Sequence, residues 1–150
     1  MAPDFPAMLA RCDAALVIGD PALFTDHRPL GADKIDLGAE WSAMTGLPFL
    51  WAFWAGRPGV ASPDHVRALD AARDAGVAAA EGVARAYCPR DEQRRIGARY
   101  LRENIRFGLG EPEHDALRTY FQMARDLGIV TDAKPLRFFE ESMTVSRHVV

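Results

Sequence analysis

A run of apolar and aromatic residues without one charge constrains this 150-residue chain more than any other feature. Residues 49–55 read FLWAFWA, and two tryptophans and two phenylalanines fall within the first six of these positions. Exposing so much aromatic surface to water is costly, and a short apolar run bounded by Pro48 and Gly56 is typical of a strand covered on both faces. We therefore predict a buried strand whose side chains belong to the core, to a pocket wall or to both.

A helix is predicted immediately before this run. Leu37, Trp41 and Met44 recur at helical spacing after a short polar turn. Gly46 then ends the helix, because glycine readily adopts the left-handed conformation that follows a helix, and a proline stands two residues later. Residues 36–56, DLGAEWSAMTGLPFLWAFWAG, are thus interpreted as a helix, a breaker and a strand.

A second apolar run, Ala14–Ile18, ends at Gly19 and is also predicted to be a buried strand. Asp20 and Pro21 follow, a pair typical of a helix start with aspartate as the N-cap and proline at the first helical position. In open α/β sheets ligands bind beyond the carboxyl ends of strands, so Gly19 and Asp20 are candidate substrate-binding residues. The alternative, in which Asp20 serves only as a helix cap, stays open on the residues alone.

The rest of the chain is predicted to be mainly helical. Ser62 followed by Pro63 opens one helix, and Asp91 and Glu111 open two more. A shorter apolar helix over residues 83–88 lies between the first and the second of these and is cut off by a proline.

Composition excludes several classes of function. The formal net charge of -3 lacks the basic footprint of a nucleic-acid-binding protein. Cys12, Cys88 and four scattered histidines have no spacing that forms a disulfide framework or a zinc site. The N-terminus lacks a signal-peptide pattern and no window approaches a membrane span, so we expect a cytoplasmic chain with no membrane partner. The sequence has no phosphate-binding glycine loop and no nucleophile elbow, and no cofactor is predicted.

Three stretches together resemble the menaquinone-biosynthesis family that contains chorismate dehydratase. They are CDAALVIGDPAL at 12–23, DLGAEWSAMTGLPFLWAFWAGRPG at 36–59 and NIRFGLGEPEHDALRTYFQMARDLGIV at 104–130. The likeness extends over nearly the whole chain, and the three motifs are specific as a set. Family members are related in fold to the type II periplasmic solute-binding proteins.

The resemblance implies an α/β fold of the type II periplasmic-binding-protein kind, with several helices packed on a small mixed sheet. It also implies a lyase that dehydrates chorismate to an enolpyruvyl-oxybenzoate in the futalosine route to menaquinone, without a cofactor or a metal. The expected partner is a small-molecule carboxylate, chorismate. Gly19 and Asp20 border the substrate cleft in this interpretation. Trp51 and Trp54 are further candidates for the cleft wall, with plain core packing as the alternative.

The likeness corresponds to the later, C-terminal part of the family's chain, and residues 1–150 are expected to form a single domain. No position matches a catalytic residue of the family, so the catalytic residues are unknown. Two other interpretations are a non-catalytic cytoplasmic module that binds small carboxylates, and one half of a split or truncated protein. Such a half would expose apolar edges, which favours a homodimer or a complementing chain.

Overall fold

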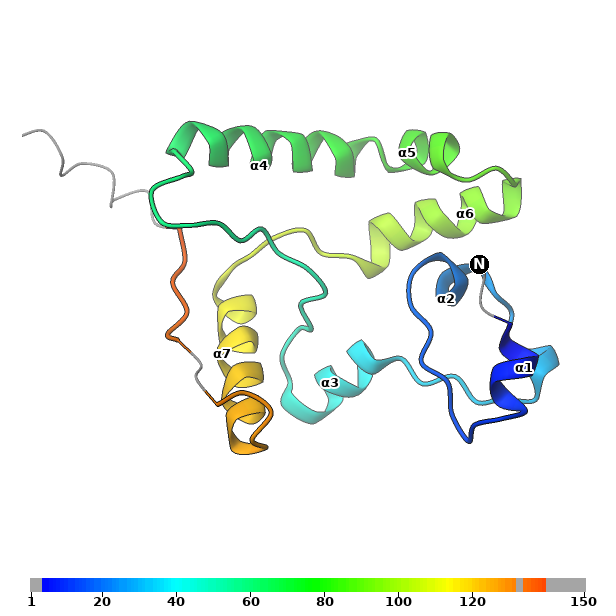
Figure 1. Ribbon diagram of the computed structural model, residues 1–150. Helices are drawn as coiled ribbons and strands as arrows, with labels where there is room; N and C mark the ends of the chain where they lie inside the picture. The colour runs from blue at the N-terminus through cyan, green and yellow to red at the C-terminus, as the bar shows by residue number, and fades with distance from the viewer. Residues whose placement is uncertain (1–3, 132–133, 140–150) are drawn as a thin grey trace, which may run out of the picture. The chain divides into compact units, whose positions relative to one another are not determined.

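The computed structural model describes residues 4–131 and 134–139. In chain order the elements are α1 (Phe5–Leu9), α2 (Asp20–Phe24), η1 (Arg28–Leu30), α3 (Leu37–Thr45), α4 (Pro63–Ala78), α5 (Ala80–Tyr87), α6 (Asp91–Arg99), η2 (Tyr100–Asn104) and α7 (Glu111–Asp126) (Figure 1). The short element η1 is a 3-10 helix and η2 is a π-helix, whereas the others are α-helices. More than half of the described residues are therefore helical.

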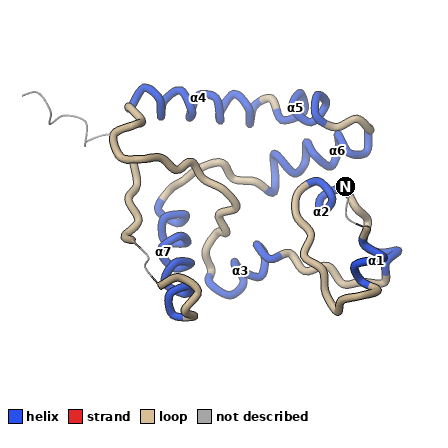
Figure 2. The backbone as a smooth tube through the Cα atoms, viewed as in Figure 1, coloured by secondary structure: helices blue, strands red, loops and turns tan. Residues whose placement is uncertain are grey.

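The prediction of an α/β fold is wrong. Neither described range contains a strand, and Figure 2 accordingly draws helices and loops there. The segments predicted to be buried strands, residues 14–18 and 49–55, are irregular and make no backbone hydrogen bond to another described segment. A strand needs a partner that satisfies its N–H and C=O groups, and these segments have the composition of strands without such a partner. The chain is therefore not the mixed-sheet fold expected of the type II periplasmic-binding-protein kind.

The two apolar segments are also more exposed than predicted. Leu16 and Ile18 are 73% and 75% exposed, and Trp51 and Trp54 are 64% and 85% exposed. The buried apolar residues of the described chain are instead small, apart from Trp41 and a leucine of α7. Neither segment forms the buried core that its composition predicted, although Phe49 of the second segment packs against Trp41 and Tyr120.

Helix starts and stops were predicted more accurately. Asp36 caps α3, because its Oδ1 accepts hydrogen bonds from the N–H groups of Gly38 at 2.9 Å and Ala39 at 3.1 Å. Gly46 ends α3 in the left-handed conformation, with φ 71°. The helices that begin at Pro63, Asp91 and Glu111 agree with their predicted starts.

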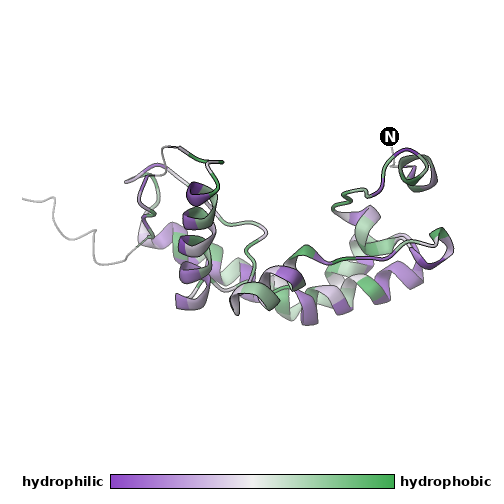
Figure 3. Ribbon diagram, turned by 90° about the horizontal axis from the view of Figure 1, so that it is seen from below, coloured by the Kyte–Doolittle hydropathy of each residue, from purple (hydrophilic) through white to green (hydrophobic). Residues whose placement is uncertain are grey.

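Hydrophobic and hydrophilic residues alternate along the helices (Figure 3), which is typical of helices that pack one side against a neighbour. Among the helices that the structure describes, none combines the length and the apolar character that a membrane span needs. The chain divides into two compact units. Unit 1 comprises Met1–Ile35 and Gly76–Arg106, and unit 2 comprises Asp36–Ala75 and Phe107–Val150.

In unit 1, α5 and α6 pack against each other as an antiparallel hairpin (Figure 1). Small residues permit the close approach, since a Cβ on Gly97 would lie 3.2 Å from Sγ of Cys88 and 3.6 Å from Cβ of Ala84. Arg94 closes the turn between the helices because its Nε donates to the Cys88 carbonyl at 2.8 Å. Helix α2 contacts α6 and so packs against this hairpin.

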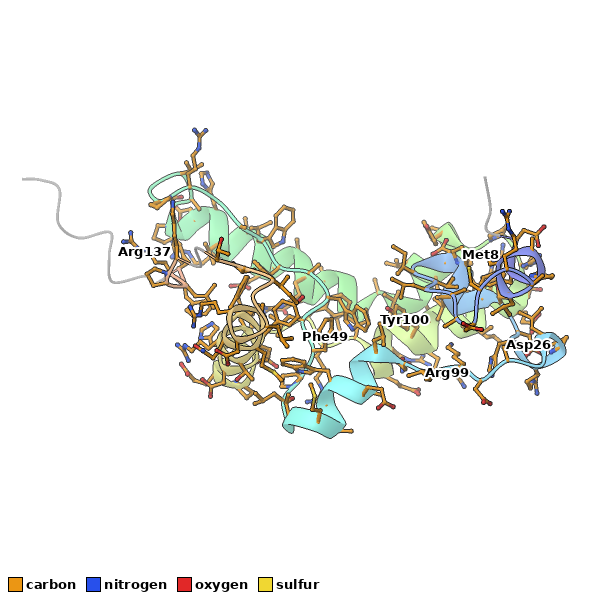
Figure 4. The ribbon with its side chains drawn as sticks, turned by 60° about the horizontal axis from the view of Figure 1, so that its bottom comes forward. Met8, Asp26, Phe49, Arg99, Tyr100 and Arg137 are labelled. Atoms are coloured by element: carbon orange, nitrogen blue, oxygen red, sulfur yellow. The ribbon has the colours of Figure 1, made fainter. Side chains whose placement is uncertain are left out.

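In unit 2, an aromatic cluster joins α3 to α7. Its members are Trp41, Phe49, Trp51, Tyr120 and Phe121. Trp41 is the buried centre, and its ring centroid lies 5.8 Å from that of Phe49 and 5.8 Å from that of Tyr120. Its indole N–H donates to the Pro48 carbonyl at 3.1 Å, which satisfies the one donor of the side chain. Phe49, labelled in Figure 4, lies on the segment that follows α3 and contacts both helices' rings.

Candidate functional site

The backbone at Gly19 adopts a conformation that favours glycine. Its φ is 68° and its ψ is -151°, a region in which a Cβ clashes with the neighbouring backbone. The Gly19 carbonyl accepts hydrogen bonds from the N–H groups of Ala22 at 3.0 Å and Leu23 at 3.1 Å, which begins α2. Gly19 is therefore the N-cap residue and Asp20 is the first residue of the helix. The interpretation in which Asp20 serves only as a helix cap is wrong, because its side chain makes no capping hydrogen bond.

The carboxylate of Asp20 binds a tyrosine instead. The hydroxyl of Tyr87 donates a hydrogen bond to Oδ2 of Asp20 at 3.0 Å, across 67 residues of sequence. This hydrogen bond raises the pKa of Tyr87, since the neutral phenol donates to the carboxylate whereas a phenolate would be repelled by it. The hydrogen bond therefore extends the pH range over which Tyr87 is a donor to values above its usual pKa of 10.0.

The Asp20–Tyr87 pair leaves one carboxylate oxygen for another partner. Within the described ranges, Oδ2 of Asp20 accepts a side-chain hydrogen bond and Oδ1 accepts none. The side chains of Asp20 and Tyr87 are both exposed. A carboxylate accepts several hydrogen bonds through its two oxygens. Oδ1 of Asp20 is therefore accessible to a hydroxyl group of a ligand.

Lys34 brings a positive charge to the same helix. Its Nζ donates to the Ala22 carbonyl of α2 at 3.4 Å. It makes no ion pair with a carboxylate in the part of the chain that the structure describes. An ammonium group that is not neutralised by the protein suits a ligand that carries a carboxylate.

Trp51 lies at the exposed edge of the aromatic cluster. Its ring centroid is 4.8 Å from that of Phe49 in an edge-to-face arrangement, and its Cζ2 lies against Gly38. The indole is thus held in place although it is 64% exposed. Trp54 is 85% exposed and makes no ring contact with another described residue. Trp51 therefore packs at the edge of the aromatic cluster, whereas Trp54 is largely exposed.

The four predicted site residues fall into two groups. Gly19 and Asp20 belong to unit 1, whereas Trp51 and Trp54 belong to unit 2. Within unit 1 the structure joins Asp20 to Tyr87, a residue that the sequence analysis missed. The Asp20–Tyr87 pair is therefore the candidate site.

The sequence carried a weak signal for Lys34 and none for Tyr87. Lys34 is one of only two lysines in a chain that otherwise uses arginine for its positive charges. Tyr87 stands before a cysteine and a proline at the end of a helix, and nothing in that pattern relates it to a position 67 residues away. Such a contact depends on how α2 and α5 both pack against α6.

Other clusters in the described residues carry less chemistry. No group of three or more histidine, cysteine, aspartate or glutamate side chains across 4–131 and 134–139 is arranged to hold a metal ion. A shallow hollow on α7 is lined by Arg118, Thr119, Gln122, Met123 and Arg125. Both of its arginines are engaged locally, Arg118 with Asp115 at 2.7 Å and Arg125 with Gln122. Arg118 is therefore neutralised by a carboxylate, whereas Arg125 is held by a neutral amide and keeps its charge.

Comparison with known protein families confirms the family resemblance. A family model described as menaquinone biosynthesis matches residues 1–126. The matched range includes the Asp20–Tyr87 pair, Lys34 and the aromatic segment. No solved structure matches the chain. The chain belongs to the menaquinone biosynthesis family.

Proposed function

We propose that this chain acts as a chorismate dehydratase-like lyase in the futalosine route to menaquinone. Membership of the menaquinone biosynthesis family supports a role in that biosynthesis. The observation that carries the finer proposal is the exposed carboxylate of Asp20, which is held by Tyr87 through one oxygen and keeps the other oxygen accessible. A hydroxyl-bearing ring is the kind of ligand that such a group orients.

The proposed reaction balances without an external oxidant or reductant. One ring C–H bond of chorismate breaks, its proton passes to solvent water, and its electron pair becomes a new ring double bond. The neighbouring C–O bond breaks as the ring hydroxyl leaves, and this hydroxyl takes up a proton from solvent and departs as water, so that no net proton is gained or lost. Because the cyclohexadiene becomes aromatic, the protein has mainly to bind the substrate, orient the hydroxyl and assist the proton transfers.

Each residue of the candidate site has a proposed role in this reaction. Asp20 accepts the hydrogen bond of the leaving ring hydroxyl through Oδ1. Lys34 offers its ammonium group to one of the two substrate carboxylates, which offsets the repulsion between that carboxylate and Asp20. Gly19 provides the backbone conformation that starts α2 at Asp20. Trp51 and Trp54 belong to unit 2 and stay a separate proposal for substrate binding, since exposed indoles pack against flat unsaturated rings.

Isothermal titration calorimetry with chorismate tests the proposal. We expect saturable binding by the wild-type protein and binding weakened by roughly tenfold in D20N, the size of one hydrogen bond to a charged group. D13N is the matched control, because Asp13 is an exposed aspartate in the same unit that makes no hydrogen bond to a described residue. Shikimate, a hydroxylated ring with one carboxylate, is the control ligand. Equal affinities of D20N and the wild type would remove Asp20 from the site.

The exposed apolar segments favour a second candidate, in which the chain needs a homodimer partner or a complementing chain. Leu16, Ile18 and Trp54 are each more than 70% exposed, and exposed apolar patches mark surfaces of association. Sedimentation velocity over a range of protein concentrations tests this candidate. A concentration-dependent dimer that is weakened in I18S would support it, and a strict monomer that binds chorismate would exclude it.

A further inference from the structure

We infer that Tyr87 is a positioning residue, which holds Oδ2 of Asp20 so that Oδ1 faces the hydroxyl group of the ligand. This inference rests on the proposed function. The contact that carries it is the hydrogen bond of 3.0 Å from the Tyr87 hydroxyl to Oδ2.

The need for such a residue follows from the place of Asp20 in α2. An exposed aspartate at a helix start is ordinarily oriented by the backbone N–H groups of the first turn. Asp20 has no such capping bond, and proline follows it in the helix. Tyr87 supplies the missing constraint on the carboxylate, because its own hydroxyl makes no other hydrogen bond in the described structure.

The two partners of this hydrogen bond are joined through the packing of α2 and α5 on α6. Tyr87 is the last residue of α5, which packs closely against α6 through small residues. Helix α2 contacts α6 as well, so both partners of the hydrogen bond rest on one helix. Arg102 and Glu81 form an ion pair between η2 and α5, which further ties α5 to the segment that follows α6.

A tyrosine suits the role better than a basic side chain does. The phenol satisfies one carboxylate oxygen but carries no charge, so Asp20 keeps its negative charge for the hydroxyl group of the ligand. An arginine at position 87 would instead form a bidentate ion pair and occupy both oxygens. The phenol is protonated at neutral pH already at its usual pKa of 10.0, and the hydrogen bond to Asp20 raises this pKa further.

The test compares Y87F with Y100F in the 150-residue chain. Y87F removes the hydroxyl and keeps the ring, whereas Tyr100 is in the same unit and its hydroxyl bonds to no described residue. We expect the dissociation constant for chorismate to rise roughly threefold to tenfold in Y87F and to stay unchanged in Y100F. The double variant D20N/Y87F should bind no more weakly than D20N alone, because the two residues act as one unit.

A second readout separates positioning from a merely structural role. The far-UV circular dichroism and the urea midpoint of Y87F should match those of Y100F, and product formation should show a raised KM with a smaller change in kcat. Affinity in Y87F equal to the wild type, with D20N impaired, would overturn the inference and leave the proposed function standing. Absence of chorismate binding by the wild type would overturn both. If the loss of binding free energy in D20N/Y87F equals the sum of the losses in D20N and Y87F, the two residues act independently and the inference is overturned.

Discussion

Gly38 lies directly against the indole of Trp51, so closely that a Cβ at position 38 would lie 2.8 Å from Cζ2. Gly38 is in the first turn of α3, and a larger side chain there would need the indole to move. The contact explains how Trp51 is held although it is 64% exposed.

Replacing Gly38 by alanine should move Trp51 without unfolding unit 2. Alanine at this first-turn position gains at most about 1 kcal/mol of helix propensity, and the loss of the contact with Trp51 opposes this gain. We therefore expect the free energy of unfolding to change by less than about 1 kcal/mol. Acrylamide quenching of tryptophan fluorescence in a W54F background should increase in G38A. G82A is the control, since nothing lies within 4 Å of a Cβ at Gly82 in α5. Unchanged quenching in G38A would refute the contact.

Replacing Gly19 by alanine should destabilise the protein through the backbone alone. No atom lies within 4 Å of a Cβ built on Gly19, so the cost comes from its φ of 68° and ψ of -151°. We expect a loss of about 1–3 kcal/mol in the free energy of unfolding, measured by urea denaturation. G56A is the matched control, because Gly56 is equally open but does not have a positive φ. Equal urea midpoints for G19A and G56A would contradict a strained backbone at position 19.

The Asp20–Tyr87 pair should be visible in the tyrosine titration. The chain has three tyrosines, and the absorbance at the phenolate wavelength should show one that ionises at higher pH than in D20N. The folded-state pKa of Tyr87 is raised above its usual 10.0, so the stability from the pair is present below that pH. It is lost as the pH rises through the folded-state pKa. Identical titrations of D20N and the wild type would rule out the hydrogen bond.

Asp26 should titrate well below an ordinary aspartate. Its hydrogen bonds to Arg28 lower its pKa from 3.8 to about 2, and Figure 4 shows it in the loop that precedes η1. The stability from this lowered pKa is present above pH 3.8 and is lost as the pH falls toward about 2. In R28Q the carboxyl carbon of Asp26, followed by NMR, should titrate close to 3.8. R57Q is the control, and a shift of similar size in R57Q would refute the assignment to Arg28.

Local signals in the sequence predicted the helices well and the strands badly. Helix α3 begins after Asp36 and ends at Gly46. Both limits depend on the side-chain and backbone geometry of a few adjacent residues. Residues 14–18 and 49–55 carry strand composition, but a strand exists only with a pairing partner, which composition does not identify.

In the candidate site too, the residues that depend on local sequence were predicted and the residue that depends on long-range packing was not. Gly19 and Asp20 were predicted from a local breaker and helix start, and both lie at the start of α2. Tyr87 could not be found, because its hydrogen bond to Asp20 depends on the packing of α2 and α5 against α6. The alternative interpretation, in which Asp20 caps α2, needed only adjacent residues. The structure instead shows the carboxylate of Asp20 hydrogen-bonded to Tyr87, 67 residues away.

Conversion of chorismate, followed by proton NMR, tests the central claim most directly. Wild-type protein incubated with millimolar chorismate should produce the aromatic proton signals of an enolpyruvyl-oxybenzoate as the ring signals of chorismate disappear. The rate should fall by roughly tenfold or more in D20N and stay unchanged in D13N. The absence of an aromatic product from the wild-type protein, or equal rates for D20N and the wild type, would contradict the claim that Asp20 orients the leaving hydroxyl.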